Sequence, residues 1–443
     1  MDEQDALQSL QVTAAEIVDL ARSQGADEAE VGASYDEGLS VTVRKGVLES
    51  VERQRDRGFA ITVYVDGCKG SASTTQSSRE ALEETLAKAL SIASFTAADK
   101  YAGLADAQLM ARESKDLDLY HPWSLTIETA ERLAKETEEA ARGTDKRISN
   151  SEGATISTGG GVQVYANSHG FCNGYATTSH SLSCCVIAED ENSLERDYWS
   201  TSARDVALLE PPELVGAVAA ERALRRLGAK QISTRKVPVV YPAELARGLF
   251  GHLVAAIGGT SQYRRASFLL GACGEQIFPD SICIDEDPFI AGAMASAPYD
   301  NEGVATQPRI LIDGGVLQGY VLSSYSARRL GLKNTGNAGG VHNLVVTPTA
   351  GTLEQMLSDA GKVFLVNELL GQGVNTVTGD YSRGAAGFWV ENGEIVHAVH
   401  EVTIAGNLKD LFYGIRAIGS DIDLRGTVRC GSVLVEGLTV AGT

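Results

Sequence analysis

Apolar residues recur at helical spacing in one segment of the chain. In YPAELARGLFGHLVAAIGG, residues 241–259, they recur every four positions from Leu245 to Ile257. His252 lies two turns after Leu245 and falls on the same face. This pattern predicts a buried helix that contains one histidine, with Pro242 at its first position. Further helices are expected over 5–24, 78–95, 125–142 (a polar helix), 212–228, 353–360 and 407–417. Two of them have capping-box patterns, Ser77 with Glu80 and Thr352 with Gln355.

Between these helices lie short β-rich runs that are separated by glycine-containing dipeptides. In residues 30–74 the dipeptides are Glu37–Gly38, Lys45–Gly46, Arg57–Gly58 and Asp66–Gly67, which predict the turns of antiparallel hairpins. In residues 156–190, Asn167–Gly170 predicts a turn. Gly159–Gly161 predicts a hairpin rather than a phosphate-binding loop, because no helix follows it.

The order of the predicted elements indicates the fold class. Strands outnumber helices and come in hairpins rather than in βαβ alternation, so the class is α+β, with mostly antiparallel sheets and flanking helices. We expect an N-terminal α+β meander module over 1–115, a middle α+β module over 116–232 and a β-rich C-terminal domain over 233–443.

Charge and cysteine content limit the classes of function. The 443 residues include 38 Lys and Arg against 58 Asp and Glu, a net charge of −20, and no basic block provides a nucleic-acid footprint. The chain contains no run of eighteen apolar residues, so no membrane span is predicted. Seven cysteines without CxxC spacing favour a reducing cytoplasm over a disulfide framework. We therefore expect a cytoplasmic protein with no nucleic-acid or membrane partner.

The residues by themselves show no complete catalytic constellation. The nearest match to a zinc peptidase motif is His397-Ala-Val-His400-Glu401, but it lies in a predicted strand, where His397 and Glu401 face away from His400. Cys184 and Cys185 point to opposite faces of a predicted strand, which favours packed thiols over a metal pair. His342 lies in a glycine-rich loop, where it is either a substrate contact or an ordinary loop residue.

Three strings carry a resemblance to a known family. They are SSYSARRLGLKNTGNAGGVHN at 323–343, GQGVNTVTGDYSRGAAGFWVENGEI at 371–395 and VTIAGNLKDLFYGI at 402–415. They resemble the TldD/PmbA family and, within it, the PmbA (TldE) branch, and the similarity extends more weakly through the whole chain. The resemblance implies a subunit of a cytoplasmic, two-subunit zinc metalloprotease. Such proteases remove leaders from modified peptides and degrade small unfolded proteins.

The resemblance also indicates where a zinc site would lie. The TldD-type subunit has a His-Glu-x-x-x-His helix followed by Gly-Leu, and a cysteine near the C-terminus completes its metal site. Alignment on Gly-Leu places Pro242 and Arg247 at the two histidine positions and Ala243 at the glutamate, while Cys430 matches the cysteine. Arg247 is a permanent cation at a position where a zinc ion needs a neutral donor. Cys430 alone, without two imidazole ligands, is a poor zinc site. We expect no catalytic, cofactor-binding or metal-ligating residue in this chain, and zinc in the partner subunit.

The resemblance therefore implies a non-catalytic subunit with a TldD-type partner and an extended peptide substrate. The segment from Gly379 to Phe388 is expected near the peptide, although a turn and strand of the core explain it equally well. Two alternatives remain open: a peptidase that acts alone, for example through His342 and nearby acids, and a peptide-binding homo-oligomer without protease activity. The isolated chain could also form a homodimer. The candidate contacts are Asp380, Tyr381, Arg383, Phe388 and His342.

Overall fold

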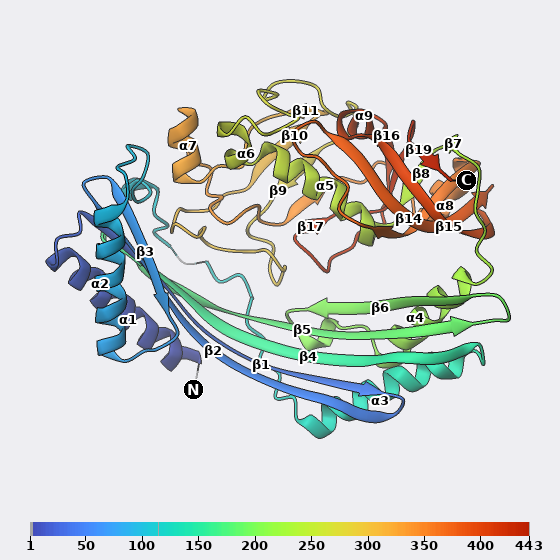
Figure 1. Ribbon diagram of the computed structural model, residues 1–443, viewed down its shortest axis with the longest axis horizontal. Coiled ribbons are helices and arrows are strands. Elements are labelled where there is room, and N and C mark those ends of the chain that lie inside the picture. Colours follow the sequence, from blue (N-terminus) through green and yellow to red (C-terminus); the bar gives the residue numbers. More distant parts are fainter. Residues whose placement is uncertain (1–2, 114, 443) are drawn as a thin grey trace.

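A six-stranded antiparallel sheet spans the N-terminal half of the protein (Figure 1). The computed structural model describes residues 3–113 and 115–442. The sheet has the order β3-β2-β1-β4-β5-β6, so β1 of the first module pairs with β4 of the second. Its strands are β1 (Glu28–Arg44), β2 (Val47–Val65), β3 (Cys68–Thr74), β4 (Ile148–Asn167), β5 (Cys172–Glu189) and β6 (Leu194–Ala203).

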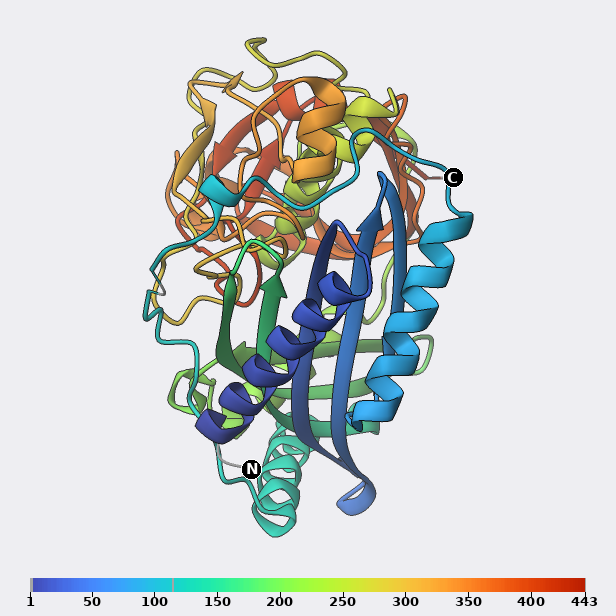
Figure 2. The same cartoon turned by 90° about the vertical axis from the view of Figure 1, so that its left-hand side faces the viewer.

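The two faces of this sheet differ in chemistry because side chains alternate along each strand. On β1, Ala29, Val31, Ala33 and Tyr35 are buried toward the helices, whereas Ser34 and its even-numbered neighbours face the other way. Figures 1 and 2 show the helices on the outer, convex side and the C-terminal domain over the concave side. The helices are α1 (Glu3–Ser23), α2 (Arg79–Phe95), α3 (Ile127–Thr144) and α4 (Pro212–Arg226), with 3-10 turns η1 (Ala107–Leu109) and η2 (Val206–Leu208).

The C-terminal domain contains an eight-stranded mixed sheet and a five-stranded sheet. The first has the order β16-β18-β8-β13-β14-β15-β19-β7 and the second β11-β10-β9-β12-β17. The strands are β7 (Arg235–Lys236), β8 (Val239–Tyr241), β9 (Ile284–Glu286), β10 (Arg309–Asp313), β11 (Val316–Leu317), β12 (Leu344–Val346), β13 (Lys362–Leu370), β14 (Asp380–Glu391), β15 (Glu394–Asn407), β16 (Ile415–Ile418), β17 (Val428–Arg429), β18 (Val433–Val435) and β19 (Thr439–Ala441).

Helix α5 (Ala243–Ile257) fills the core of this domain. Leu249, Phe250, Leu253 and Ile257 are at most 1% exposed, so the apolar face seen in the sequence is the buried face. The other helices of the domain are α6 (Gly259–Tyr263), α7 (Ser324–Leu330), α8 (Leu353–Asp359) and α9 (Leu408–Tyr413).

The α+β class and the mostly antiparallel N-terminal sheet are confirmed, but three predicted turns are wrong. Glu37–Gly38, Arg57–Gly58 and Gly159–Gly161 lie inside long strands rather than at their ends. Glycine serves another purpose at Gly161, where a side chain would collide with the Asp36 carboxylate on the neighbouring strand. The predicted turns at Lys45–Gly46, Asp66–Gly67 and Asn167–Gly170 are confirmed.

The predicted helix ends need smaller corrections. The cap of α2 is Ser78, whose side chain accepts from Ala81 N, rather than Ser77. Pro242 is the N-cap of α5, and α9 ends at Tyr413 instead of continuing to 417. The capping box of Thr352 and Gln355 is confirmed. In the described ranges, no helix is long and apolar enough to cross a membrane.

Candidate functional site

The positions that the resemblance aligns with a zinc site lie together in this fold, although almost 190 residues separate Ala243 from Cys430 along the chain. The Cys430 Sγ lies 4.0 Å from the backbone oxygen of Ala243, the first residue of α5. One turn later, Arg247 Nη1 lies 3.7 Å from Asp423 Oδ2. The backbone N–H of Asp423 in turn donates to the Cys430 carbonyl at 3.0 Å. The start of α5 and the segment from Asp423 to Cys430 thus form one polar corner.

The groups in this corner do not fit a zinc ion. Burial, with the neighbouring Asp423 charge, raises the pKa of Cys430 to about 12, so the thiol stays protonated at neutral pH. Ala243 offers no side-chain donor, and the guanidinium of Arg247 is a cation. Among residues 3–113 and 115–442, no three His, Cys, Asp or Glu side chains are grouped so that they could hold a metal.

Asp423 is the charged centre of this corner. Its side chain is 3% exposed and accepts from the backbone N–H and the guanidinium of Arg425, with Nε at 2.8 Å. Burial alone would raise the pKa of Asp423, but the hydrogen bonds from Arg425 and the charge of Arg247 hold it below the ordinary value. The carboxylate therefore remains ionised and compensates the two arginines. Arg425 also donates to the Ser200 carbonyl on β6, which ties this corner to the N-terminal sheet.

The predicted peptide-contact segment forms strand β14, inside the eight-stranded sheet. Asp380 is exposed at its start and accepts a hydrogen bond from Thr378 Oγ1 at 2.6 Å. Tyr381 and Phe388 are 2% and 4% exposed and belong to the core. Arg383 is partly buried and donates to the Leu369 carbonyl at 3.3 Å. The role of these residues as peptide contacts stays a prediction.

His252, His397, His400, Cys184 and Cys185 indicate no site of their own among the described residues. His252 is half-buried with its ring centroid 6.2 Å from that of Tyr381, and burial and the Arg383 charge lower its pKa. His397 and His400 lie on strand β15, as expected, and a positive φ at Glu401 interrupts the regular alternation there. Burial raises the pKa of the thiols of Cys184 and Cys185 to about 12.

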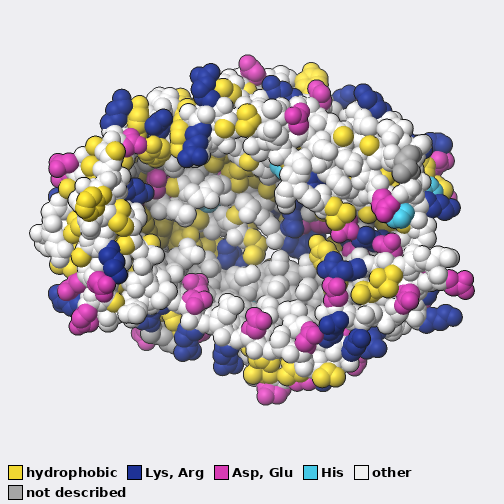
Figure 3. All heavy atoms as spheres, viewed as in Figure 1, with side chains coloured by type: hydrophobic (Ala, Val, Ile, Leu, Met, Phe, Trp, Pro, Cys, Tyr) yellow, Lys and Arg dark blue, Asp and Glu magenta, His cyan; other side chains and the backbone are white. Residues whose placement is uncertain are grey.

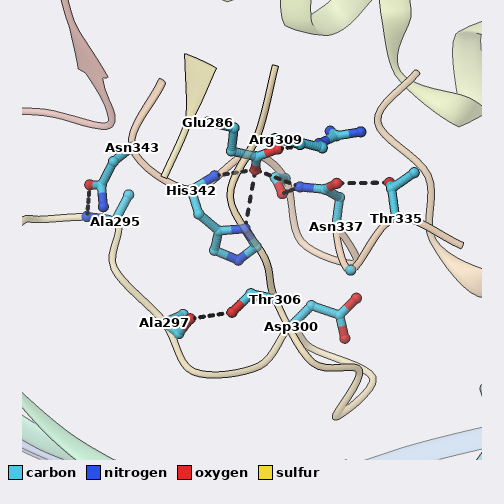
Figure 4. Close-up of polar contacts among 12 residues, drawn as sticks. Glu286, Ala295, Ala297, Asp300, Thr306, Arg309, Thr335, Asn337, His342 and Asn343 are labelled. Carbon is cyan, nitrogen blue, oxygen red and sulfur yellow. Dashed lines mark hydrogen bonds and ion pairs between the residues drawn. The ribbon is translucent and has the colours of Figure 1, made fainter. Parts of the chain in front are cut away.

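His342 belongs to a hydrogen-bonded cluster that is built on a buried carboxylate (Figure 4). Glu286, at the end of β9, is 2% exposed. Its Oε1 accepts from His342 N at 2.7 Å, His342 Nδ1 at 3.2 Å and Asn337 Nδ2 at 2.7 Å. Its Oε2 accepts from Arg309 Nε at 2.6 Å. Burial would raise the pKa of Glu286, but the His342 and Arg309 contacts lower it.

This cluster fixes the chemistry of the His342 ring. An ionised carboxylate can only accept, so Nδ1 is the donor, and a ring in its neutral form then has its lone pair on Nε2. In Figure 4 this second nitrogen points toward the loop that carries Ala297 and Asp300. The arrangement holds the Nε2 atom of His342 in a fixed orientation, in which this atom can act as a hydrogen-bond acceptor or as a base. Sequence reasoning proposed acids near His342 but did not identify Glu286, because the two residues are 56 positions apart.

The concave face of the six-stranded sheet and the C-terminal domain enclose a hollow that is visible in Figure 3. One part of it, a cavity of about 860 Å³, lies between β1–β5 and the loop of Tyr299, Asp300 and Asn301. A second cavity of about 680 Å³ lies between β6 and the corner of Asp423. Both volumes fall in the range that is typical of ligand pockets.

Comparison with known proteins places the whole chain in one family. Residues 29–93, 120–227 and 234–442 match PmbA/TldA metallopeptidase domain 1, the central domain and the C-terminal domain, respectively. Metalloprotease PmbA of Escherichia coli O157:H7 is 50% identical over 416 residues, which cover 94% of this chain and 92% of that protein.

Solved structures support the same assignment. A Bacteroides thetaiotaomicron protein, described as a candidate modulator of DNA gyrase, has a TM-score of 0.93 and 29% identity, covering 98% of this chain and 99% of its own. TldE from Thermococcus kodakarensis has a TM-score of 0.85, and the match covers 97% of this chain and 100% of that protein. At 20% identity this likeness shows the fold alone. The chain belongs to the PmbA/TldD metallopeptidase family, as a PmbA-type member.

Proposed function

We propose that this chain is the non-catalytic, PmbA/TldE-type subunit of a two-subunit zinc metalloprotease, and that a TldD-type partner holds the zinc. The corner of Ala243, Arg247 and Cys430 carries this proposal. At the three positions of the zinc helix the chain has no donor for the metal, and Arg247 is paired with Asp423 beside a protonated thiol. The residues present therefore do not fit zinc, and no step of the chemistry passes through a metal in this chain.

In this proposal the chain binds and orients the peptide for its partner. An extended peptide lies in the hollow of Figure 3, and strand pairing supplies main-chain hydrogen bonds. Strand β6 supports this role because it is one of the two edge strands of the six-stranded sheet, with one side free of sheet partners in the described residues. His342 Nε2 adds an acceptor of fixed orientation for a peptide N–H.

The biological work that fits this role is proteolysis and peptide maturation in the cytoplasm: removal of leaders from modified peptides and degradation of small unfolded proteins. The seven free cysteines support a reducing compartment. Cleavage of a leader-bearing peptide by each subunit alone and by the 1:1 mixture tests the proposal. We expect that the mixture cleaves the peptide, that chelators inhibit this cleavage and that this chain alone does not cleave the peptide.

One observation favours a second candidate, a peptidase that needs no partner. The Glu286–His342 pair has the geometry of an oriented base, with the carboxylate holding the imidazole. If this pair activates water, His342→Gln abolishes cleavage by the isolated chain and chelators have no effect. A third possibility, a peptide-binding homo-oligomer, predicts binding without cleavage by either the chain or the mixture.

A further inference from the structure

We propose that an exposed basic surface on α6, α7 and the connecting segment 99–106 binds a short acidic segment of a partner protein. Lys and Arg side chains gather over α6 and α7 at the upper left of Figure 3. This surface, called the cation ladder below, consists of Lys100, Tyr101, Arg329, Tyr263 and Arg264. Its partner is recognised by charge, independently of any role of the chain in peptide cleavage.

Cations and tyrosine rings alternate along the ladder. Lys100 Nζ lies 4.9 Å from the centre of the Tyr101 ring. The guanidinium carbon of Arg329 lies 5.1 Å from the ring centres of both Tyr101 and Tyr263. The guanidinium carbon of Arg264 lies 5.9 Å from the Tyr263 ring centre. All three cations are exposed, and a contact with a ring face uses their charge but none of their N–H donors. These donors therefore remain available to a ligand.

Three segments that are distant in the sequence form this surface. The Arg328 guanidinium holds the connecting segment against α7, because its Nη1 donates to the Tyr101 and Gly103 carbonyls at 3.4 and 3.2 Å. At the start of α6, the Gly259 N–H donates to the carbonyl of Val321 at 2.8 Å, in the segment that leads into α7. The backbone thus fixes the three segments relative to one another, and each of them supplies one cation of the ladder.

The local charge of this surface is positive, although the whole chain has a net charge of −20. In the described ranges no carboxylate forms an ion pair with Lys100, Arg264 or Arg329. Hydrogen bonds, chiefly from the Tyr101 N–H, and the charges of Arg329 and Lys100 lower the pKa of Asp99, so this one acid compensates one cation. The other charged residues within 98–101, 259–265 and 324–333 are all basic: Lys100, Arg264, Arg265, Arg328, Arg329 and Lys333.

An acidic peptide segment fits this surface better than a nucleic acid does. Carboxylates accept charge-assisted hydrogen bonds from Lys and Arg. Side chains two residues apart on an extended peptide lie on one face, roughly 7 Å apart, so acids at alternate positions can reach successive cations. Bases would need free tyrosine faces for stacking, but cations already lie over Tyr101 and Tyr263. A long polyanion would also be repelled by the rest of the acidic chain, which salt screens for a short segment.

Binding of two matched peptides to the purified full chain tests this surface. Both are acetylated heptapeptides of serine and glycine with a neutral BODIPY dye at the C-terminus. One has glutamate at three alternate positions and the other has glutamine there. A dye-labelled thymidine octanucleotide is the nucleic-acid probe, and fluorescence anisotropy gives the Kd values. We expect the glutamate peptide to bind about tenfold more tightly than the glutamine peptide, and more tightly than the octanucleotide.

Variants at the two ends of the ladder separate this surface from general attraction. Lys100→Gln and Arg264→Gln should each weaken binding of the glutamate peptide about two- to fivefold, as expected for exposed ion pairs, and the double variant about tenfold. Both variants leave Arg329 between its two rings, so the connecting segment keeps its place. Lys409→Gln is the matched control, because it removes an exposed cation on α9, away from α6 and α7 in Figure 1. This control should bind as the parent does.

Equal Kd values for the glutamate and glutamine peptides, or no binding by either, would overturn the proposal. So would a double variant that binds the glutamate peptide as tightly as Lys409→Gln does. Tighter binding of the octanucleotide, with losses in the same variants, would assign the surface to nucleic acid and would also overturn the proposal. No TldD-type subunit or metal enters the measurement, so its outcome is separate from that of the proposed function.

Discussion

Removal of the Asp423 carboxylate should strongly destabilise the C-terminal domain. In Asp423→Ala, Arg425 loses its hydrogen-bonded partner at 2.8 Å and Arg247 its ion pair at 3.7 Å. Breaking a fully buried pair costs about 3–5 kcal/mol. The Arg425 and Arg247 side chains are 20% and 45% exposed in the folded protein, so their hydration offsets part of this cost. We expect a loss of about 2–3 kcal/mol, and about 1–2 kcal/mol for Asp423→Asn, which keeps an acceptor.

Thermal unfolding followed by calorimetry measures this effect. With about 2–4 °C per kcal/mol for a domain of this size, Asp423→Ala should lower Tm by about 4–12 °C. The folded-state pKa of Asp423 is lowered, so its contribution is present above the unfolded pKa and disappears as the pH falls through the folded value. The difference in Tm between the parent and Asp423→Ala should therefore be constant from about pH 6 to 8 and shrink below about pH 4.

Asp359→Ala is the matched control, because it removes an exposed carboxylate from the end of α8 and should stay within about 0.5 kcal/mol of the parent. An Asp423→Ala protein as stable as this control, or a gap that is unchanged at pH 3, would refute the description of the corner as a charge-compensated pair.

Three further predictions concern metal, packing and pH. The purified chain should bind no stoichiometric zinc, and elemental analysis that finds about one tightly held zinc per chain would contradict this. His252→Ala should cost roughly 1–3 kcal/mol by removing a half-buried ring beside Tyr381, and both it and Arg247→Ala should leave cleavage by the assembled complex intact. Loss of that cleavage with folding and assembly retained would give α5 a catalytic role. Burial raises the pKa of Asp300 to about 6, so its ionisation should lower the stability of the parent by up to about 3 kcal/mol between pH 4 and 7. Denaturant titrations should show that the free energy of unfolding declines less between about pH 4 and 7 for Asp300→Asn than for the parent. Parallel plots of this free energy against pH would exclude the effect.

The sequence predicted helices α1 to α5, α8 and α9 but missed the short helices α6 and α7, and glycine misled the prediction of turns. The apolar face from Leu249 to Ile257 is a local pattern, and the structure buries it. Gly159–Gly161 reads locally as a turn, yet it lies in the middle of β4, where β1 and β5 pass on either side. A side chain at position 161 would collide with the Asp36 carboxylate and the Tyr35 carbonyl, which lie more than a hundred residues earlier, and no local pattern contains that information.

The candidate site was predictable only where a motif could be aligned. Ala243, Arg247 and Cys430 were chosen through the family resemblance, and the fold brings them to one corner. Asp423 was not identified from the sequence, because its place beside Arg247 depends on how α5 packs against the C-terminal segment. Glu286 ends a strand of three residues, and its pairing with His342 depends on β9 lying beside β12. Contacts of this kind arise from the packing of the domain.

Peptide cleavage by the separate and mixed subunits tests the central claim most directly. A leader-bearing peptide is incubated with this chain, with a TldD-type subunit and with their 1:1 mixture, each with and without a chelator. The account predicts a stable complex, cleavage by the mixture that the chelator stops, and none by this chain alone. Robust cleavage by this chain alone that is insensitive to the chelator would contradict the assignment of a non-catalytic subunit.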